Sequence, residues 1–236
     1  EAGLPAPIQK TVLIENIGLQ GNRRSCVATT AKVWKVIRDL LARTRDARIL
    51  GMDARHFSFN RAGGRCEACN GLGTQSVHLP PLPPKEKICA TCDGKRFDET
   101  VLRVRYRNCS VHDILELEVS EAKKIFQNIP KAYSRLLALE EVGVGYLKLG
   151  QTTSSLSGGE GRRVRLAEEL AKALGSKEKL DGLLVLLDDP SSSVHPDDAL
   201  TIANCLIQLR SKGATVILAT HQENLVAQAD HVIQLS

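Results

Sequence analysis

Four of the seven cysteines fall in two close pairs, and this spacing constrains the fold more than any other feature of the chain. The pattern is C-x2-C-x19-C-x2-C, formed by Cys66, Cys69, Cys89 and Cys92. Each pair places two thiolates on one tight turn, and four thiolates suit zinc, a borderline-soft ion without a geometric preference of its own. The stretch 63–96 has too few apolar residues to form a core alone, so we predict that a four-cysteine zinc site holds it together.

A redox-active pair or a chance cluster is the alternative interpretation of these cysteines. A glycine-containing turn follows each pair, and backbone N–H groups in such turns can hydrogen-bond the anionic sulfurs. The other three cysteines, Cys26, Cys109 and Cys205, stand alone. We interpret them as small buried hydrophobic residues.

Apolar runs indicate a parallel β-sheet built from both ends of the chain. The candidate strands are Thr11–Glu15, Leu183–Leu187, Thr215–Ala219 and His231–Leu235. Runs that are apolar on both faces fit the strands of a buried parallel sheet. A helical pattern that ends at Gly213 links the second strand to the third as a βαβ unit. We therefore predict an α/β fold whose sheet is incomplete at its start, which favours a chain that is an excerpt of something longer.

The sequence LSGGE, Leu156 to Glu160, opens a predicted helix. Gly158 and Gly159 carry no side chains, so a polyphosphate can approach the backbone closely. The free N–H groups and the dipole of a helix N-terminus favour an anion there, and Ser157 adds a hydroxyl. An ordinary Ser-capped helix is the alternative interpretation of these five residues.

Two carboxylates, Asp188 and Asp189, end the strand predicted at Leu183–Leu187. Ligands bind at the carboxyl ends of parallel strands, so Asp188 can hold Mg²⁺ and Asp189 can position a hydrolytic water. His221 follows the next strand at the same edge of the sheet. The chain contains no phosphate loop of the form Gly-x4-Gly-Lys-Ser/Thr to hold a nucleotide by itself.

The net charge of +5 is unevenly placed along the chain. The segment Arg23–Arg65 holds eleven Lys and Arg residues against three Asp, a local charge of +8. Such a basic segment predicts a polyanion partner, and a solvated helix face is the alternative. No apolar run reaches the ~18 residues of a membrane span and the N-terminus lacks a signal-peptide pattern, so we expect a cytoplasmic protein with no membrane contact.

Several of these motifs together resemble the ABC ATPases. LSGGE resembles their signature motif, Leu183–Pro190 their Walker B strand, Ser193–His195 their D-loop and His221 their switch histidine. Within that superfamily the chain is similar to the UvrA family of bacterial nucleotide excision repair, in its C-terminal half. The long runs Arg55–Gly73 and Val142–Leu170 carry this resemblance, which begins at about residue 11.

The resemblance implies a partial ABC-type nucleotide-binding core, residues 1–28 and 171–236. A mostly helical signature subdomain, residues 29–170, interrupts this core and carries the zinc module, residues 64–96. The resemblance also implies ATP with Mg²⁺ between two such halves, supplied by a homodimer or by a second half of the same polypeptide. It further implies binding to damaged double-stranded DNA and to a UvrB-like partner.

The same resemblance assigns roles to individual residues. Asp188 binds Mg²⁺, Asp189 is the catalytic carboxylate and His221 senses the γ-phosphate. The signature of one half faces the phosphate loop of the other through Ser157, Gly158, Gly159 and Glu160.

Two departures from the family pattern leave alternatives open. The phosphate loop, expected before residue 1, is absent from the chain, and Asp189 stands where the family usually has Glu. The shorter carboxylate arm misplaces an attacking water, so a non-catalytic zinc-stabilised DNA or protein adaptor in a degenerate ABC shell is the alternative function. A third interpretation is a DnaJ-type chaperone zinc module, which predicts four C-x-x-C-x-G-x-G repeats; only Cys66–Gly73 is a full repeat here.

Overall fold

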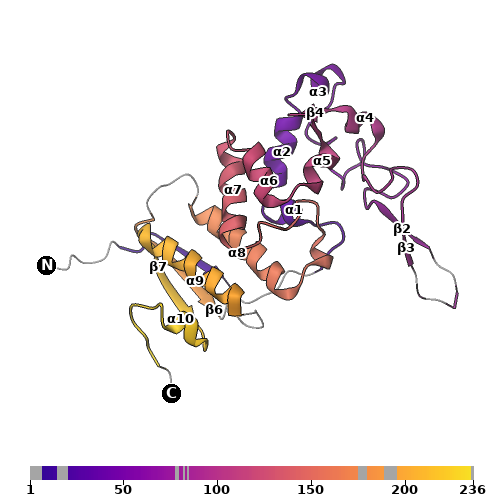
Figure 1. Cartoon of the computed structure of the whole chain (residues 1–236). Coiled ribbons are helices and arrows are strands. Elements are labelled where there is room, and N and C mark those ends of the chain that lie inside the picture. Colours follow the sequence, from indigo (N-terminus) through magenta and orange to yellow (C-terminus); the bar gives the residue numbers. More distant parts are fainter. Residues whose placement is uncertain are drawn as a thin grey trace.

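The computed structural model describes residues 7–14, 21–77, 80–81, 83, 85–174, 180–188 and 196–234. A small sheet with its helices lies at one end of the molecule, and a larger, mostly helical part lies at the other (Figure 1). The hairpin of β2 (Thr74–Val77) and β3 (Lys85–Ile88), which we call the zinc-module hairpin, projects sideways from the helical part.

The sheet joins the two ends of the sequence. It holds β1 (Lys10–Ile14), β6 (Leu183–Asp188) and β7 (Thr215–Ala219) in the order β1-β6-β7, and both pairings are parallel. Val12 lies opposite Val185, which lies opposite Val216 on its other side. Helix α9 (Pro196–Ser211) connects β6 to β7 and packs against β7. This arrangement confirms the predicted α/β fold with a parallel sheet and helices.

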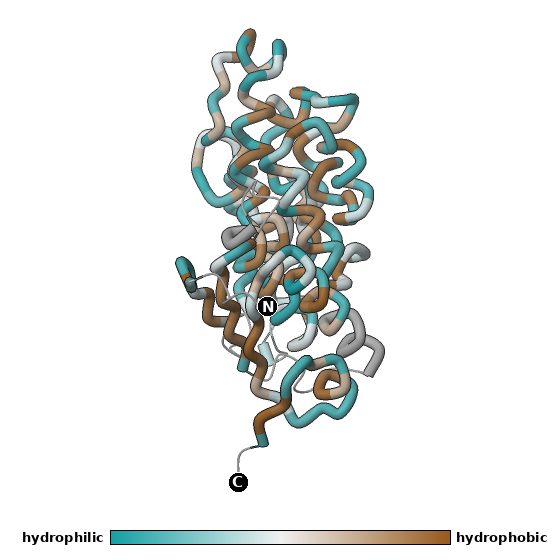
Figure 2. Tube along the Cα trace, turned by 90° about the vertical axis from the view of Figure 1, so that its left-hand side faces the viewer, coloured by the Kyte–Doolittle hydropathy of each residue, from teal (hydrophilic) through white to brown (hydrophobic). Residues whose placement is uncertain are grey.

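One face of the sheet is more buried than the other, which corrects the expectation that both faces are fully covered. Val12, Val185 and Leu187 are buried, whereas Leu13 and Ile217 are each 56% exposed. Exposure alternates along each strand because successive side chains point to opposite faces of a sheet. Helices α8 and α9 pack on β1 and β7. The strands form a hydrophobic zone in the lower part of Figure 2.

The strand predicted at His231–Leu235 is wrong over residues 231–234, and Leu235 lies outside the described residues. The segment follows α10 (Glu223–Val226) and makes no ladder with β7. Val232 and Ile233 are 62% and 85% exposed. Apolar residues alone do not make a strand when no neighbouring strand satisfies their backbone groups.

The helical part contains short helices around one aliphatic core with a few aromatic side chains. Its elements are α1 (Val27–Thr30), α2 (Val33–Leu41), α3 (Arg45–Ile49), α4 (Glu99–Arg103), β4 (Arg105–Tyr106), β5 (Cys109–Ser110), α5 (Val111–Glu116), α6 (Val119–Ile125), α7 (Pro130–Glu141), the 3-10 turn η1 (Thr153–Ser155) and α8 (Gly158–Leu174). Phe57, Phe97, Phe126, Leu136 and Leu139 are fully buried in it. No helix in the described part of the chain is long and apolar enough to span a membrane.

Short polar side chains set the beginnings of several of these helices. Thr44 accepts a hydrogen bond from the N–H of Ala47 at the start of α3. Ser110 and Asp113 form a capping box at α5, in which each side chain accepts from the other's backbone N–H. Each cap satisfies N–H groups that have no partner inside the helix.

Backbone hydrogen bonds join the two ends of the segment that carries α2 to α7. The N–H of Val27 donates to the carbonyl of Gln151 at 3.0 Å, and that of Ala28 donates to the carbonyl of Leu149 at 2.9 Å. In the other direction the N–H of Thr153 donates to the carbonyl of Ser25 at 2.9 Å. We call these two paired segments, Ser25–Ala28 and Leu149–Thr153, the neck.

Two of the three isolated cysteines fit the interpretation as buried hydrophobic residues. Cys26 is 0% and Cys205 is 3% exposed, and burial raises the pKa of both thiols. Cys109 is only partly buried, but it packs against the same hydrophobic core.

Phe126 tests whether the helical part has one cooperative core. Its ring is fully buried and stacks on that of Tyr106, with centroids 5.7 Å apart. We expect Phe126→Ala to lower the free energy of unfolding by ~3–5 kcal/mol in urea titrations, because the truncation leaves a cavity. Ile233→Ala, at a largely exposed position, is the control and should change it by less than ~0.5 kcal/mol. An equally small effect of Phe126→Ala would contradict a single packed core.

Candidate metal centre and phosphate-facing turn

The four paired cysteines come together in the folded chain. Their sulfur atoms all lie within 4.8 Å of one another, and all four residues are buried. The Sγ atoms of Cys66 and Cys89 are 4.0 Å apart, and those of Cys69 and Cys92 are 3.7 Å apart. A tetrahedral zinc ion with Zn–S bonds of ~2.3 Å requires sulfurs about 3.8 Å apart. The donor set and its spacing therefore fit a zinc ion.

The same left-handed turn follows each cysteine pair. Asn70 and Gly71 have φ of 51° and 75° after the first pair, and Asp93 and Gly94 have φ of 49° and 76° after the second. Glycine and Asn or Asp are the residues that tolerate this region best. The N–H of Gly73 donates to Sγ of Cys69 at 3.2 Å, which confirms the expected N–H···S contact.

Backbone pairing holds the two turns against each other. The N–H of Cys66 donates to the carbonyl of Arg96, and the N–H of Cys89 donates to that of Gly73, both at 2.9 Å. An antiparallel hairpin of β2 (Thr74–Val77) and β3 (Lys85–Ile88) extends from these turns. Most side chains of this hairpin are exposed, so the module has little core beyond its sulfurs.

The surroundings of the thiols act differently on their pKa values. Burial raises the pKa of Cys66 and of Cys92. The backbone N–H of Cys92 lowers the pKa of Cys89. Thiols with raised pKa values are protonated at neutral pH unless a cation displaces the protons, so metal binding at this cluster releases protons.

The LSGGE turn forms a reciprocal capping box at the start of α8. The N–H of Ser157 donates to Oε2 of Glu160 at 2.7 Å, and the N–H of Glu160 donates to Oγ of Ser157 at 3.2 Å. The hydroxyl of Tyr146 donates to Oε1 of Glu160 at 2.8 Å. Burial opposes ionisation of Glu160, but these donors outweigh it and lower its pKa. The Ser-capped helix considered from the sequence is therefore present, and it fixes the shape of the turn.

The outer surface of this turn is open. Ser157 and Gly158 are exposed, and a Cβ added to Gly158 would meet no atom within 4 Å. Internal packing therefore gives no reason for a glycine at this position. The N–H groups of the first turn of α8 have no partner within the helix, and the helix dipole makes this end positive. The turn can accept an anion that comes from outside this part of the chain.

Asp188 and the segment before His221 end at one edge of the sheet. Asp188 lies opposite Ala219 in the parallel ladder, and His221 follows two residues later. Both side chains are exposed. Asp189 and the segment Ser193–His195 lie outside the described residues.

The LSGGE turn begins α8, whereas Asp188 ends β6 in the sheet. This helix of 17 residues is about 25 Å long and leads from the helical part towards the sheet (Figure 1). Within the described residues, Asp188 forms no hydrogen bond or ion pair with Ser157–Glu160.

Comparisons with known proteins identify the chain. Over 228 residues, 97% of the chain, it is 40% identical to UvrABC system protein A of Aquifex aeolicus and to that of Borreliella burgdorferi. The crystal structure of UvrA2 from Deinococcus radiodurans covers 94% of the chain at 37% identity with a TM-score of 0.81; the chain in turn covers 27% of that structure. The chain belongs to the UvrA family. It spans about a quarter of the length of the curated relatives it matches, 24%, and no family model matches it.

The loop Gly21–Arg24 of this UvrA-family chain joins the zinc module to the segment before LSGGE, a connection that the sequence alone did not reveal. On one side Arg23 forms an ion pair with Glu86 at 2.7 Å and donates to Oγ1 of Thr74, both in the zinc-module hairpin. On the other side the N–H of Asn22 donates to Oγ1 of Thr153 at 3.0 Å, just before the LSGGE turn. These partners are 51 to 131 residues away in sequence, so no local pattern reveals them.

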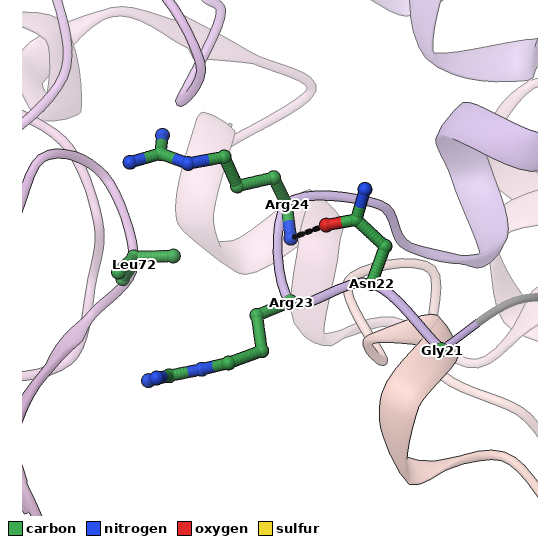
Figure 3. A pocket seen from close by; sticks show the side chains of 5 residues that line it. All are labelled: Gly21, Asn22, Arg23, Arg24 and Leu72. Carbon is green, nitrogen blue, oxygen red and sulfur yellow. Dashed lines mark hydrogen bonds between the residues drawn. The ribbon is translucent and has the colours of Figure 1, made fainter.

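This loop borders a cavity of about 430 Å³ beside the zinc module (Figure 3). The side chains of Arg23 and Arg24 extend from the loop on the side of Leu72. The N–H of Arg24 donates to Oδ1 of Asn22 at 2.8 Å, which stabilises the turn of the loop. The loop is therefore a shaped connection between the zinc module and the segment before the LSGGE turn.

The basic segment divides into neutralised and free charges. Four of its cations form ion pairs with carboxylates: Arg23 with Glu86, Lys32 with Glu168, Arg55 with Asp53 and Arg65 with Glu67. Other exposed cations form no ion pair or side-chain hydrogen bond within the described residues; these are Lys35, Arg43, Arg45, Arg48 and Arg61. The positive charge that remains available to a partner is thus concentrated on α2, α3 and the loop at Arg61.

Zinc content and its pH dependence test the metal centre. We expect about one zinc ion per chain, and we expect its affinity to fall as pH drops from 8 to 6. The fall should be about tenfold per pH unit for each proton that zinc displaces, measured by competition with a chelator. Cys92→Ser should remove the metal, whereas Cys205→Ser, a buried thiol outside the cluster, should leave it bound. Substoichiometric metal in freshly purified, unchelated protein would contradict the site.

Proposed function

We propose that this chain is the part of a UvrA-like ATP-dependent subunit of nucleotide excision repair that supplies a signature turn, a Mg²⁺-binding edge, a zinc module and a DNA-facing surface. The open turn at Gly158 carries the proposal. It is shaped by a capping box and has an exposed glycine that internal packing does not require.

The turn is suited to read the γ-phosphate of ATP held by the phosphate loop of another ABC half. That half is a second copy or a second half of the same polypeptide. The N–H groups of Gly158 and Gly159 and the dipole of α8 supply positive potential to the phosphate. Because the capping box fixes Ser157 and Glu160 beforehand, little ordering is needed when the phosphate arrives.

The edge at Asp188 serves the other nucleotide site of such a pair. Asp188 would hold Mg²⁺, which neutralises charge on the phosphates when it is bound. His221 follows β7 at the same edge, where it is suited to sense the γ-phosphate. Asp189 is the carboxylate for the attacking water in this proposal, with an arm one methylene shorter than Glu.

The zinc ion has a structural role in this proposal. The module between the cysteine pairs has little apolar surface to bury, so the metal supplies the free energy that folds it. The loop at Arg23 connects this module to the segment before LSGGE. Folding of the module therefore supports the position of the signature turn.

Damaged double-stranded DNA is the proposed polyanion partner, and a UvrB-like protein is the proposed recipient of the DNA complex. The free cations of the basic segment support the first assignment, because unpaired Arg and Lys side chains bind phosphates without first breaking an internal ion pair. Membership of the UvrA family supports the second.

A complementation assay tests the proposed nucleotide role. The chain alone should show no ATP turnover. Mixed with a UvrA-family polypeptide that carries a phosphate loop but ends before its second signature turn, it should restore turnover. Gly158→Val should reduce the restored rate by ~100-fold, since a side chain there displaces the phosphate while the fold has room for it. Equal rates with Gly158→Val, or turnover by the chain alone, would contradict the proposal.

A non-catalytic DNA or protein adaptor is the second candidate function. Asp189 in the place of the family's usual Glu is the observation that favours it. The same assay separates the two functions. An adaptor would restore no turnover in the mixture, while its zinc content and DNA affinity would remain intact.

A further inference from the structure

The end of α3 forms a tip of aliphatic and arginine side chains, residues 43–51. We propose that this α3 tip inserts Ile49 and Leu50 into stacked DNA bases from the minor groove while Arg43, Arg45 and Arg48 bind the flanking phosphates. The proposal rests on the proposed DNA-binding function. It names a side-chain wedge that the function itself does not require.

Two adjacent aliphatic side chains at this tip face solvent. Ile49 is 70% and Leu50 is 48% exposed. Gly51 follows with φ of 63°, and a Cβ there would meet no atom within 4 Å. The tip therefore protrudes, and its aliphatic pair leaves apolar surface that a partner can bury.

The charges around this pair fit a polyanion. Arg43, Arg45 and Arg48 are exposed and form no ion pair or side-chain hydrogen bond within the described residues. Asp46 is the single acidic residue of the stretch 43–51. The next acidic residue, Asp53, is occupied by an ion pair with Arg55. Three free guanidinium groups thus lie within seven residues of one exposed aliphatic pair.

The backbone of the tip is held in place. Ala47 is fully buried beneath it. The N–H of Ala47 donates to Oγ1 of Thr44, and the carbonyl of Ala47 accepts from the N–H of Met52. The N–H of Leu50 donates to the carbonyl of Asp46 at 3.0 Å. A preorganised wedge loses little conformational entropy when it binds, so more of the burial energy is available for unstacking bases.

The position of the tip leaves it accessible to a long ligand. Figure 1 places α3 at the end of the molecule opposite the sheet. A duplex can therefore reach the tip without meeting the carboxylate edge at Asp188.

The combination of residue types favours DNA over an acidic protein partner. Proteins that bend DNA from the minor groove combine Arg side chains with Leu, Ile, Met, Phe or Pro wedges that unstack a base step. The tip has both components within seven residues, Arg43 to Ile49, plus Leu50. An acidic protein at this surface is the competing outcome of the test below.

Fluorescence of 2-aminopurine in a duplex tests the wedge. The full chain is titrated with a 2-aminopurine duplex over a series of salt concentrations. Binding of the wild type should raise the fluorescence, because unstacking relieves quenching of the base. Ile49→Ser with Leu50→Ser should abolish the rise and weaken binding ~10-fold without changing the salt dependence.

The arginine variants give the opposite signature. Arg43→Gln, Arg45→Gln and Arg48→Gln together should reduce the slope of log affinity against log salt by ~2–3, since each lost phosphate contact contributes ~0.9. Ile233→Ser and Arg103→Gln, exposed positions outside the tip, should change neither signal. Zinc content and thermal unfolding should stay at wild-type values in every variant.

Each remaining outcome overturns the proposal. DNA binding without a fluorescence rise, or with a rise that survives the Ile49 and Leu50 changes, removes the wedge and leaves the proposed function standing. DNA binding that is insensitive to all tip variants does the same and points to an acidic protein at this surface. No DNA binding by the wild type overturns the proposed DNA function together with the wedge.

Discussion

The paired segments of the neck are the constraint on which the rest of this structure depends. Ser25–Ala28 and Leu149–Thr153 are more than 120 residues apart in sequence, yet reciprocal backbone hydrogen bonds join them. Cys26, Val27 and Ala28 are all 0% exposed at this point. Loop closure over such a distance carries an entropic cost, which the buried hydrogen bonds and the core above the neck must offset.

Both candidate sites are attached to this neck. The LSGGE turn begins three residues after Thr153. The hydrogen bond from the N–H of Thr153 to the carbonyl of Ser25 therefore anchors the chain just before the turn. The loop that precedes the neck carries Arg23 to the zinc-module hairpin. Short, direct contacts thus join the zinc module, the neck and the LSGGE turn into one continuous structure.

The sequence predicts local features of this molecule well. The two cysteine pairs predict the sulfur cluster, because a C-x2-C turn brings its own ligands together. The apolar runs at Leu183–Leu187 and Thr215–Ala219 predict β6 and β7, and the Ser157–Glu160 spacing predicts a capped helix. In each case the residues that determine the structure lie within a few positions of one another.

The sequence does not predict the features that depend on partners far away along the chain. Nothing near His231 reveals that no strand pairs with it in the described sheet, and summed charge over Arg23–Arg65 does not show that Arg23 faces Glu86 while Arg48 faces solvent.

Native-state hydrogen exchange tests the central role of the neck most directly. The amides of Val27, Ala28 and Thr153 donate across the neck, and that of Leu139 lies within the buried helix α7. If the neck holds the helical part closed, all four amides should exchange through one opening, with equal free energies and equal denaturant dependence. Fast exchange of the three neck amides while Leu139 stays protected would contradict the account, because the core would then persist without the neck.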